Sequence, residues 1–368
     1  MIHLMDSPPR PPDGGFPPFL LAVAGVSSFL LAALGVGLMR RLARRRKILD
    51  QPTPRSLHSR PTPRGGGLVI VVLALVAVPA FSAFLPAVRW TPVIAYVIGT
   101  ALMAGISWLD DLYSLSPWTR LGVHGVASTI VVAGCGAGPA IAVPILGELF
   151  LGWAAYPLAV LWLVAVSNAF NFMDGIDGMA GLQALVAATA WGAVGVHLSL
   201  PLAAGLGVVL AGASLGFLVH NWSPARIFMG DVGSVFLGFS LGAVPFLAAA
   251  GTGPGSGRTG TLPLLAVAFL WPFICDTGFT LLRRAIRGEN VLQAHRSHLY
   301  QRLVLAGHSH RAVAVFYGGL AVLGALCGLA WLLLGWDAAP VAGTVGLGAV
   351  LWGSVRWRER VMRAGQKR

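Results

Sequence analysis

The chain has 368 residues, of which 56% are apolar and only 11% are charged, and its formal net charge is +13. Soluble domains carry about 25% charged residues, so this composition excludes an ordinary soluble protein and favours a surface that faces lipid. The positive charge alone would suggest a nucleic-acid partner, but its distribution along the chain argues against one.

Apolar runs long enough to cross a bilayer, about 20 residues each, recur along the whole chain. The sequence therefore predicts an all-α integral membrane protein, a polytopic bundle of 10 or 11 transmembrane helices that forms one domain over residues 1–368. The predicted spans are 18–39, 66–87, 92–109, 120–137, 150–167, 178–197, 200–219, 234–250, 262–283, 312–334 and 338–355. We interpret 138–149 as a hairpin or re-entrant piece on the outer side and 251–260 as a Gly-rich turn.

The basic residues predict the orientation. With the N-terminus outside and the spans alternating, all but three of the 26 Lys and Arg residues fall on the inner side, the exceptions being Arg10, Arg89 and Arg258. Cytoplasmic loops are enriched in these residues, so we expect an odd number of spans and a cytoplasmic C-terminus. The charge then serves orientation and contact with anionic lipid rather than with nucleic acid.

Two acidic stretches follow predicted spans on that inner side. Asp110 and Asp111 end the third span, and neighbouring carboxylates at a membrane boundary need a cation or a shared proton. The pair therefore has either a metal or general-base role or lies at a solvated helix end. In NAFNFMDGIDG (168–178), Asn168 and Asn171 are three apart, as are Asp174 and Asp177, so each pair shares one side of a helical turn. Such amides and carboxylates suit a nucleotide or a metal with oxygen ligands.

Two further segments carry polar groups at span boundaries. In RIFMGDVGS (226–234), Asp231 precedes a helix start, where free N–H groups attract phosphate and Asp231 either holds Mg²⁺ or merely caps the helix. In SLHSRPTPRGGG (56–67), Arg64 and three glycines either cradle a phosphate or pack helices closely.

The last polar segment is the basic loop 283–303. His295, Arg296 and His298 cluster there, and imidazole and guanidinium groups suit a diphosphate. Asp276, within the ninth span, is either a site carboxylate or the partner of an Arg. We rank His308 and His310 lower. Placed on one membrane face, these groups form the inventory that phosphoryl transfer needs.

The motifs resemble those of the polyprenyl-phosphate N-acetylhexosamine-1-phosphate transferases, the bacterial superfamily that includes the enzymes starting O-antigen and teichoic acid synthesis and phospho-N-acetylmuramoyl-pentapeptide transferase. The resemblance rests on the pair Asp110-Asp111, on NAFNFMDGIDG, on MGDVGS and on the His-containing loop, and covers about 56–303. It implies a UDP-N-acetylated sugar and undecaprenyl phosphate as substrates, Mg²⁺ with Mn²⁺ as a substitute, and a cytoplasmic-face site in the bacterial inner membrane. Membrane lipid and a homodimer partner are compatible with it, and nucleic acid is not expected.

The resemblance also implies roles for single residues. Asp110 and Asp111 would serve catalysis, with Asp110 deprotonating or orienting the lipid phosphate, and Asp231 would hold Mg²⁺ with Asn168 as a further ligand. The remaining groups would line the nucleotide pocket, meet the diphosphate or complete the N-terminal signature: Asn168, Asn171, Asp174, Asp177, His295, Arg296, His298, Ser56, His58 and Arg64. The loop reads HRSHLYQRL, whereas many members carry a compact H-x-H-H. This resembles the branch that starts O-antigen on N-acetylfucosamine or N-acetylquinovosamine.

The expected reaction transfers N-acetylhexosamine 1-phosphate to undecaprenyl phosphate, with release of UMP, and so begins an O-antigen-like cell-envelope polysaccharide. Direct attack by the lipid phosphate is our hypothesis, and a two-step route through an aspartyl-phosphate stays open. The alternative function is a multi-span secondary transporter, whose acidic residues would lie near the membrane midplane rather than at one interface.

Overall fold

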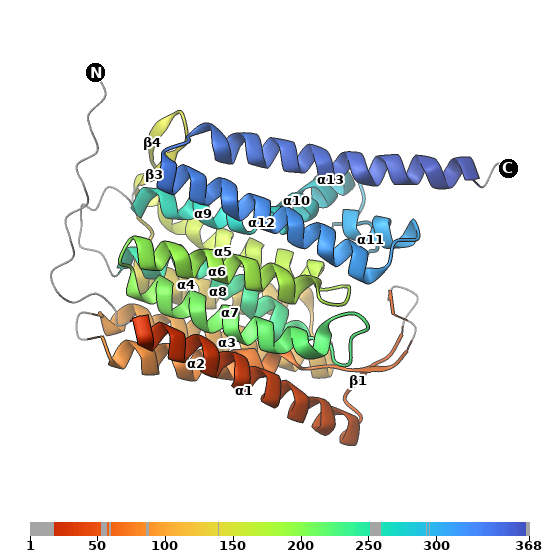
Figure 1. Cartoon of the computed structure of the whole chain (residues 1–368), viewed down its shortest axis with the longest axis horizontal. Helices are drawn as coiled ribbons and strands as arrows, with labels where there is room; N and C mark the ends of the chain where they lie inside the picture. The colour runs from red at the N-terminus through yellow and green to blue at the C-terminus, as the bar shows by residue number, and fades with distance from the viewer. Residues whose placement is uncertain are drawn as a thin grey trace.

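The computed structural model describes residues 18–52, 57–58, 60–85, 88–138, 140–250, 259–291, 293 and 295–365. Within them the chain forms a helical bundle with two short two-stranded sheets (Figure 1). The α-helices are α1 (Pro18–Arg45), α2 (Gly67–Ala83), α3 (Trp90–Tyr113), α4 (Pro117–Cys135), α5 (Ala155–Met173), α6 (Met179–His197), α7 (Pro201–Asn221), α8 (Asp231–Ala250), α9 (Leu262–Phe269), α10 (Trp271–Ile286), α11 (Leu299–Leu305), α12 (His310–Leu334) and α13 (Ala338–Gly365).

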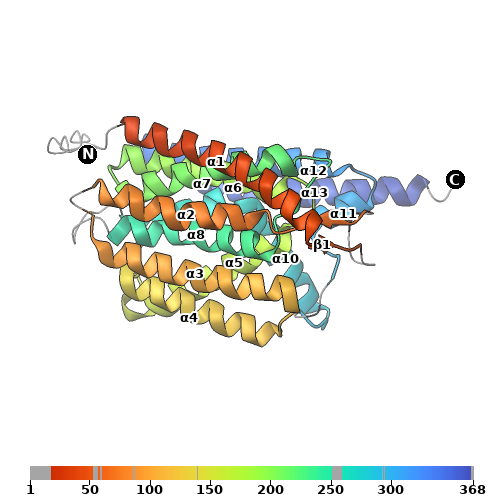
Figure 2. The same ribbon diagram turned by 90° about the horizontal axis from the view of Figure 1, so that it is seen from below.

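Helix α8 forms the centre of the bundle. Nearly all of its side chains are buried, and helices α2, α3, α5 and α7 lie around it (Figure 2). At the outside, α1 and α13 leave many large apolar side chains exposed, such as Leu34, Leu38 and Val345. A surface of this kind is costly in water and natural in lipid. The distribution of apolar residues thus confirms the predicted all-α membrane architecture.

Within the described residues, eight helices are long and apolar enough to cross a membrane, and the pair α9 and α10 would make nine if it counts as one span. Each of the eleven predicted spans corresponds to a helix or to this pair. Helix α2 has only 17 residues and α4 is not among the eight, so the number eleven stays a prediction. The fifth predicted span ended at residue 167, but α5 continues to Met173 and therefore includes Asn168 and Asn171.

The ninth predicted span is broken. Helices α9 and α10 meet at Leu270 with a bend of 70°. Pro272, at the start of α10, lacks an N–H group and its ring crowds the preceding turn, which favours a break in the helix there. The bend directs α10, which carries Asp276, toward the short helix α11.

The two ends of the bundle differ. At one end, which we call the hairpin end, strands β3 (Ala140–Val143) and β4 (Gly147–Phe150) form the predicted hairpin. At the other, the site end, lie β1 (Leu49–Asp50), β2 (Thr62–Pro63) and α11 (Figure 1). Helix α1 begins at the hairpin end and α13 finishes at the site end, as an odd number of crossings requires. Of the predicted turn 251–260, residues 251–258 lie outside the described residues.

Candidate active site

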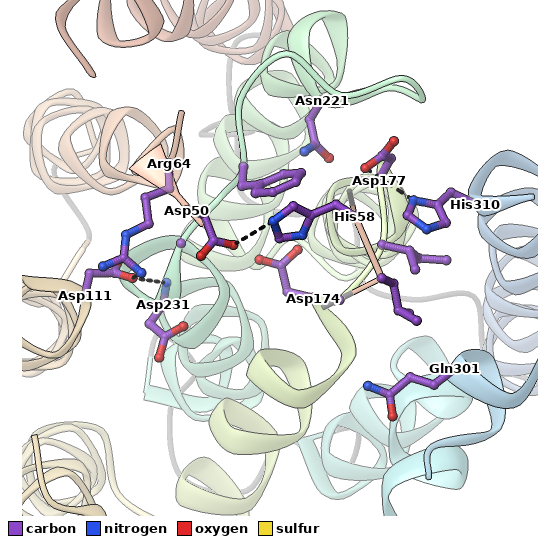
Figure 3. Close-up of a pocket in the computed structure, with 15 residues that line it drawn as sticks. Asp50, His58, Arg64, Asp111, Asp174, Asp177, Asn221, Asp231, Gln301 and His310 are labelled. Carbon is purple, nitrogen blue, oxygen red and sulfur yellow. Dashed lines mark hydrogen bonds and ion pairs between the residues drawn. The ribbon is translucent and has the colours of Figure 1, made fainter. Parts of the chain in front are cut away.

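A cavity of about 210 Å³ opens at the site end, where segments distant in the sequence converge. Figure 3 shows acidic side chains from the β1 strand, the ends of α3 and α5 and the start of α8 around this space. Its lining residues are Asp50, Leu57, His58, Arg64, Asp111, Asp174, Gly175, Ile176, Asp177, Asn221, Phe228, Gly230, Asp231, Gln301 and His310.

The start of α8 is held by Asp111 from the last turn of α3. Its two carboxylate oxygens accept hydrogen bonds from the backbone N–H groups of Asp231 (3.3 Å) and Val232 (3.2 Å). Arg64 lies 3.5 Å from the same carboxylate. The free N–H groups that we expected to attract phosphate are thus already bonded, and Asp111 rather than Asp231 is the helix cap.

Asp110 points to different partners and does not line the cavity. One of its oxygens lies 2.6 Å from Arg120 Nη1, and the other accepts the N–H of Leu115 at 2.7 Å. The same Arg120 nitrogen lies 3.8 Å from Asp231. Asp110 therefore fixes a cation beside Asp231, and the adjacent carboxylates of Asp110 and Asp111 are stabilised by separate partners.

Asp174 follows α5 directly and has no such partner. No hydrogen bond or ion pair joins its carboxylate to another residue in the described part of the chain. Burial, and after it the nearby carboxylates of Asp231, Asp111, Asp177 and Asp50, raise the pKa of Asp174 well above its ordinary value. The site thus holds more negative charge than its own side chains neutralise.

Asp177, unlike Asp174, has partners that lower its pKa. Burial alone would raise its pKa, but the His310 ring, whose Nδ1 lies 3.4 Å away, and the N–H of Ala225 at 3.1 Å outweigh burial and hold the pKa below its ordinary value. The following Gly178 adopts a left-handed conformation (φ +77°) and donates its N–H to the side chain of Asn221. This turn therefore fixes an ionised carboxylate at the cavity wall.

The two asparagines of the same motif lie on the last turns of α5. Asn171 donates to the hydroxyl of Ser234 on α8 at 3.1 Å. Asn168 donates to the carbonyl of Val164 at 2.7 Å and lies 3.4 Å from His124 on α4. Neither residue lines the cavity, so in this arrangement they join α5 to its neighbours.

For the glycines of the segment 56–67, the sequence left two readings open, a phosphate cradle and close helix packing. The N–H groups of Gly66 and Gly67 donate to the carbonyls of Phe228 and Met229, both at 2.9 Å. A Cβ on Gly67 would collide with the backbone of Gly233 at the start of α8. These glycines therefore let α2 approach α8 closely, and their N–H groups are not free for a phosphate.

Beside the glycine run, His58 lines the cavity and lies 3.7 Å from Asp50 on β1. Its ring contacts Phe228 edge-on, with 4.9 Å between the ring centroids. The third member of the predicted N-terminal signature, Ser56, lies outside the described residues.

The histidine loop lies next to the cavity rather than in it. His298 is buried and its Nδ1 lies 3.2 Å from Asp276. The ring of His295 lies 4.8 Å from that of His298, and its Nδ1 accepts from Ser297. Arg296 is exposed. From this segment only Gln301, one helical turn beyond His298, lines the cavity.

The carboxylates at the cavity suit a divalent cation. In the part of the chain that the structure describes, Asp174 has no hydrogen-bond or ion-pair partner, and the ion-pair partner of Asp231 is Arg120, 3.8 Å away. Magnesium typically takes one or two protein carboxylates and completes its shell with water and phosphate oxygens. Among the described residues no three His, Cys, Asp or Glu side chains form a cluster that could hold a metal ion. Asn168 does not line the cavity, so its predicted metal contact has no support here.

The structure thus brings six of the predicted residues to one cavity: Arg64, His58, Asp111, Asp174, Asp177 and Asp231. The lining does not include the other described candidates, which are Asp110, Asn168, Asn171, His295, Arg296 and His298. The sequence analysis missed Asp50, Asn221 and Gln301 and ranked His310 too low. Asp50 could have been found from the sequence, because carboxylates are rare in this chain. Asn221 is a neutral amide, and nothing in the sequence marked it as a site residue.

Comparisons with known proteins agree with this geometry. A profile of the family described as Glycosyl transferase family 4 matches residues 93–249. A probable undecaprenyl-phosphate N-acetylglucosaminyl 1-phosphate transferase of Bacillus subtilis is 33% identical over 302 residues, 81% of each chain. A decaprenyl-phosphate N-acetylglucosaminephosphotransferase of Mycobacterium tuberculosis is 34% identical over 82% of this chain and 80% of its own. A phospho-N-acetylmuramoyl-pentapeptide-transferase of Synechococcus is 31% identical over 88% of this chain and 93% of its own.

Proposed function

The chain belongs to glycosyl transferase family 4, and from this premise we propose that it transfers an N-acetylhexosamine 1-phosphate from a UDP-sugar to undecaprenyl phosphate. The products are UMP and a lipid diphosphate-sugar, the first intermediate of an O-antigen-like cell-envelope polysaccharide. The enzyme would lie in the bacterial inner membrane with its site end in the cytoplasm, where the basic residues gather.

The observation that carries the proposal is the acidic cavity at one end of a membrane bundle. A polyprenyl phosphate is amphiphilic, so its tail stays in the bilayer while its phosphate reaches the interface. The nucleotide sugar arrives from water at the same interface. A site with excess carboxylates at that level suits a reaction between two phosphate groups that share a divalent cation.

Asp231 and Asp174 would hold Mg²⁺, with Mn²⁺ as a substitute. When bound, the ion would neutralise phosphate charge in the reaction. Two arginines supply positive charge near Asp231: Arg64, which pairs with Asp111, and Arg120, which pairs with Asp110. Both side chains are about one third exposed. Asp177, His310 and Asn221 form the opposite wall, which we assign to the nucleotide sugar.

The reaction that we propose is direct. An oxygen of the lipid phosphate bonds to the β-phosphorus of the nucleotide sugar, the bond from that phosphorus to the bridging oxygen breaks, and UMP leaves with the electron pair. A phosphate monoester has a second pKa near 6 and is largely ionised at neutral pH, so the attack needs no strong base. We therefore assign Asp110 to holding Arg120 rather than to taking a proton. A phosphorylated enzyme trapped in a single turnover would contradict the direct route.

The test is release of UMP by the purified protein from UDP-N-acetylglucosamine, UDP-N-acetylfucosamine and UDP-N-acetylquinovosamine with undecaprenyl phosphate and Mg²⁺. We expect turnover with at least one donor, dependent on both the lipid and the metal. Failure with every donor, together with solute uptake by proteoliposomes, would replace the proposal with a transporter.

A further inference from the structure

Asp276 is the most heavily hydrogen-bonded carboxylate in the described part of the chain. It lies on α10 after the bend and is 0% exposed. Its donors are Leu299 N (2.8 Å), Tyr300 N (3.0 Å), Tyr317 Oη (2.6 Å) and Thr280 Oγ1 (3.2 Å), and His298 Nδ1 lies 3.2 Å away. None of these groups belongs to Arg or Lys. Asp276 is therefore not the partner of an Arg, which was one of the two roles predicted for it from the sequence.

The two backbone donors explain how a buried charge is tolerated. Leu299 and Tyr300 begin α11, where N–H groups have no partner within the helix. A carboxylate there satisfies two of them and benefits from the positive end of the helix dipole. The His298 ring lies at the same helix start, with its Nδ1 3.2 Å from Oδ1 of Asp276.

From α11 the network reaches the cavity. The hydroxyl of Tyr300 donates to the carbonyl of Phe172 at 3.1 Å and accepts from the side chain of Gln301 at 3.2 Å. Phe172 precedes Asp174 by two residues, and a Cβ on Gly175 would collide with the Tyr300 hydroxyl. The segment that Asp276 anchors therefore lies directly against the loop that carries Asp174.

Gln301 itself faces the cavity and also fixes its own helix start. Its side-chain oxygen accepts the N–H of His298 at 3.2 Å, in a capping box. The rings of His298 and Tyr300 stack with 6.0 Å between their centroids. Rotation or displacement of α11 would therefore move Gln301 and the ring of His298 together.

We propose that Asp276 is a positioning residue that anchors the segment His298–Gln301 and thereby places Gln301 at the cavity, where it extends the wall that we assign to the nucleotide sugar. The inference rests on the proposed function, since it assigns a substrate to that wall. Asp276 does not line the cavity and acts through α11. The acceptor lipid, which enters from the bilayer, does not depend on this anchor.

The test compares Asp276→Asn and Tyr317→Phe with wild type, using as the donor whichever of the three UDP-sugars supports UMP release. For Asp276→Asn we expect the donor KM to rise about tenfold, equal to about 1.4 kcal/mol, while the KM for undecaprenyl phosphate changes by less than about twofold. For Tyr317→Phe, which removes one donor and keeps the carboxylate, we expect a rise of about threefold. The donor concentration needed to raise Tm should increase in each variant in parallel with its donor KM. This measurement reports binding and needs no turnover.

Tyr96→Phe is the matched control. Tyr96 is as buried as Tyr317, and its hydroxyl lies 2.9 Å from the hydroxyl of Ser240. Both residues lie on helices other than α11, far from it in the sequence. It should lower Tm by a similar amount and leave both KM values and the donor-induced Tm shift unchanged. Equal responses of Tyr317→Phe and Tyr96→Phe would overturn the inference, as would equal rises in both KM values. If wild type released no UMP, the proposed reaction would fail, while the donor-induced Tm shifts would still decide the role of Asp276.

Discussion

The carboxylate of Asp111 caps the helix that begins at Asp231, with 3.3 Å between its Oδ1 and the backbone nitrogen of Asp231. Two aspartates that are 120 residues apart thus perform different tasks at one point. Asp111 uses both of its oxygens to hold the backbone, whereas the side chain of Asp231 is directed to the cavity. This division allows their substitutions to be told apart.

Asp111→Asn should destabilise the protein as well as lower turnover. An amide keeps one acceptor oxygen, so one of the two backbone N–H groups at the start of α8 loses its partner. We expect a loss of about 1–2 kcal/mol, which corresponds to a fall of about 2–6 °C in Tm in detergent. Thermal unfolding checks this. An unchanged Tm would show that the cap contributes nothing to stability.

Asp231→Asn should abolish UMP release and leave Tm and membrane insertion close to those of wild type. The cap of α8 comes from Asp111, so the backbone stays fixed while a metal-holding carboxylate is lost. Asp337→Asn, whose carboxylate accepts only the indole N–H of Trp331, is the control and should retain full activity. Normal turnover by Asp231→Asn would remove Asp231 from the metal site.

Asp174→Asn should stabilise the metal-free protein while it abolishes activity. Because the pKa of Asp174 is raised in the folded state, the retained proton stabilises the fold at low pH, and this contribution is lost as pH rises through the folded pKa. In EDTA, the Tm of Asp174→Asn should therefore exceed that of wild type by a margin that grows from pH 5 to pH 8. Saturating Mg²⁺ should shrink the margin, since it neutralises the same repulsion. A margin independent of pH would contradict the assignment.

His310→Gln should raise the KM for the donor and leave the KM for the lipid unchanged. The His310 ring contributes to the lowered pKa of Asp177 and forms part of the wall assigned to the nucleotide sugar. We expect an effect of about three- to tenfold, typical of the loss of one charge-assisted contact. His308→Gln, two residues away and lining a different pocket, is the matched control and should behave as wild type. Equal effects of both variants would remove His310 from the site.

Gly67→Ala should destabilise the protein by about 1–3 kcal/mol, because the added methyl group meets the backbone of Gly233 and separates α2 from α8. Gly125→Ala is the control on α4, where a Cβ meets nothing within 4 Å. It should stabilise its helix by about 0.5–1 kcal/mol. Unfolding in detergent checks both signs. A neutral Gly67→Ala would mean that the two helices are free to separate.

Much of the site was accessible from the sequence because polar residues are rare in this chain. Each of Asp111, Asp174, Asp177 and Asp231 lies at the end of an apolar run, where a charge is costly without a purpose. The family resemblance implied that Asp110 and His298 contact substrate, whereas the structure gives their side chains protein partners. Composition reveals that a polar group is needed at a position but not which group it contacts.

The sequence by itself determined the elements: apolar runs at helix length gave the helices, Pro139 and Pro144 interrupted one run at the hairpin, and the distribution of Lys and Arg predicted the orientation. Only the tertiary structure decided which carboxylate caps α8, that α9 and α10 bend at Leu270, and that Asp276 anchors α11 from a helix 23 residues away. Hydropathy depends on each residue and its neighbours in the chain. A hydrogen bond depends on where two chain segments meet, and that is set by the packing of the whole bundle.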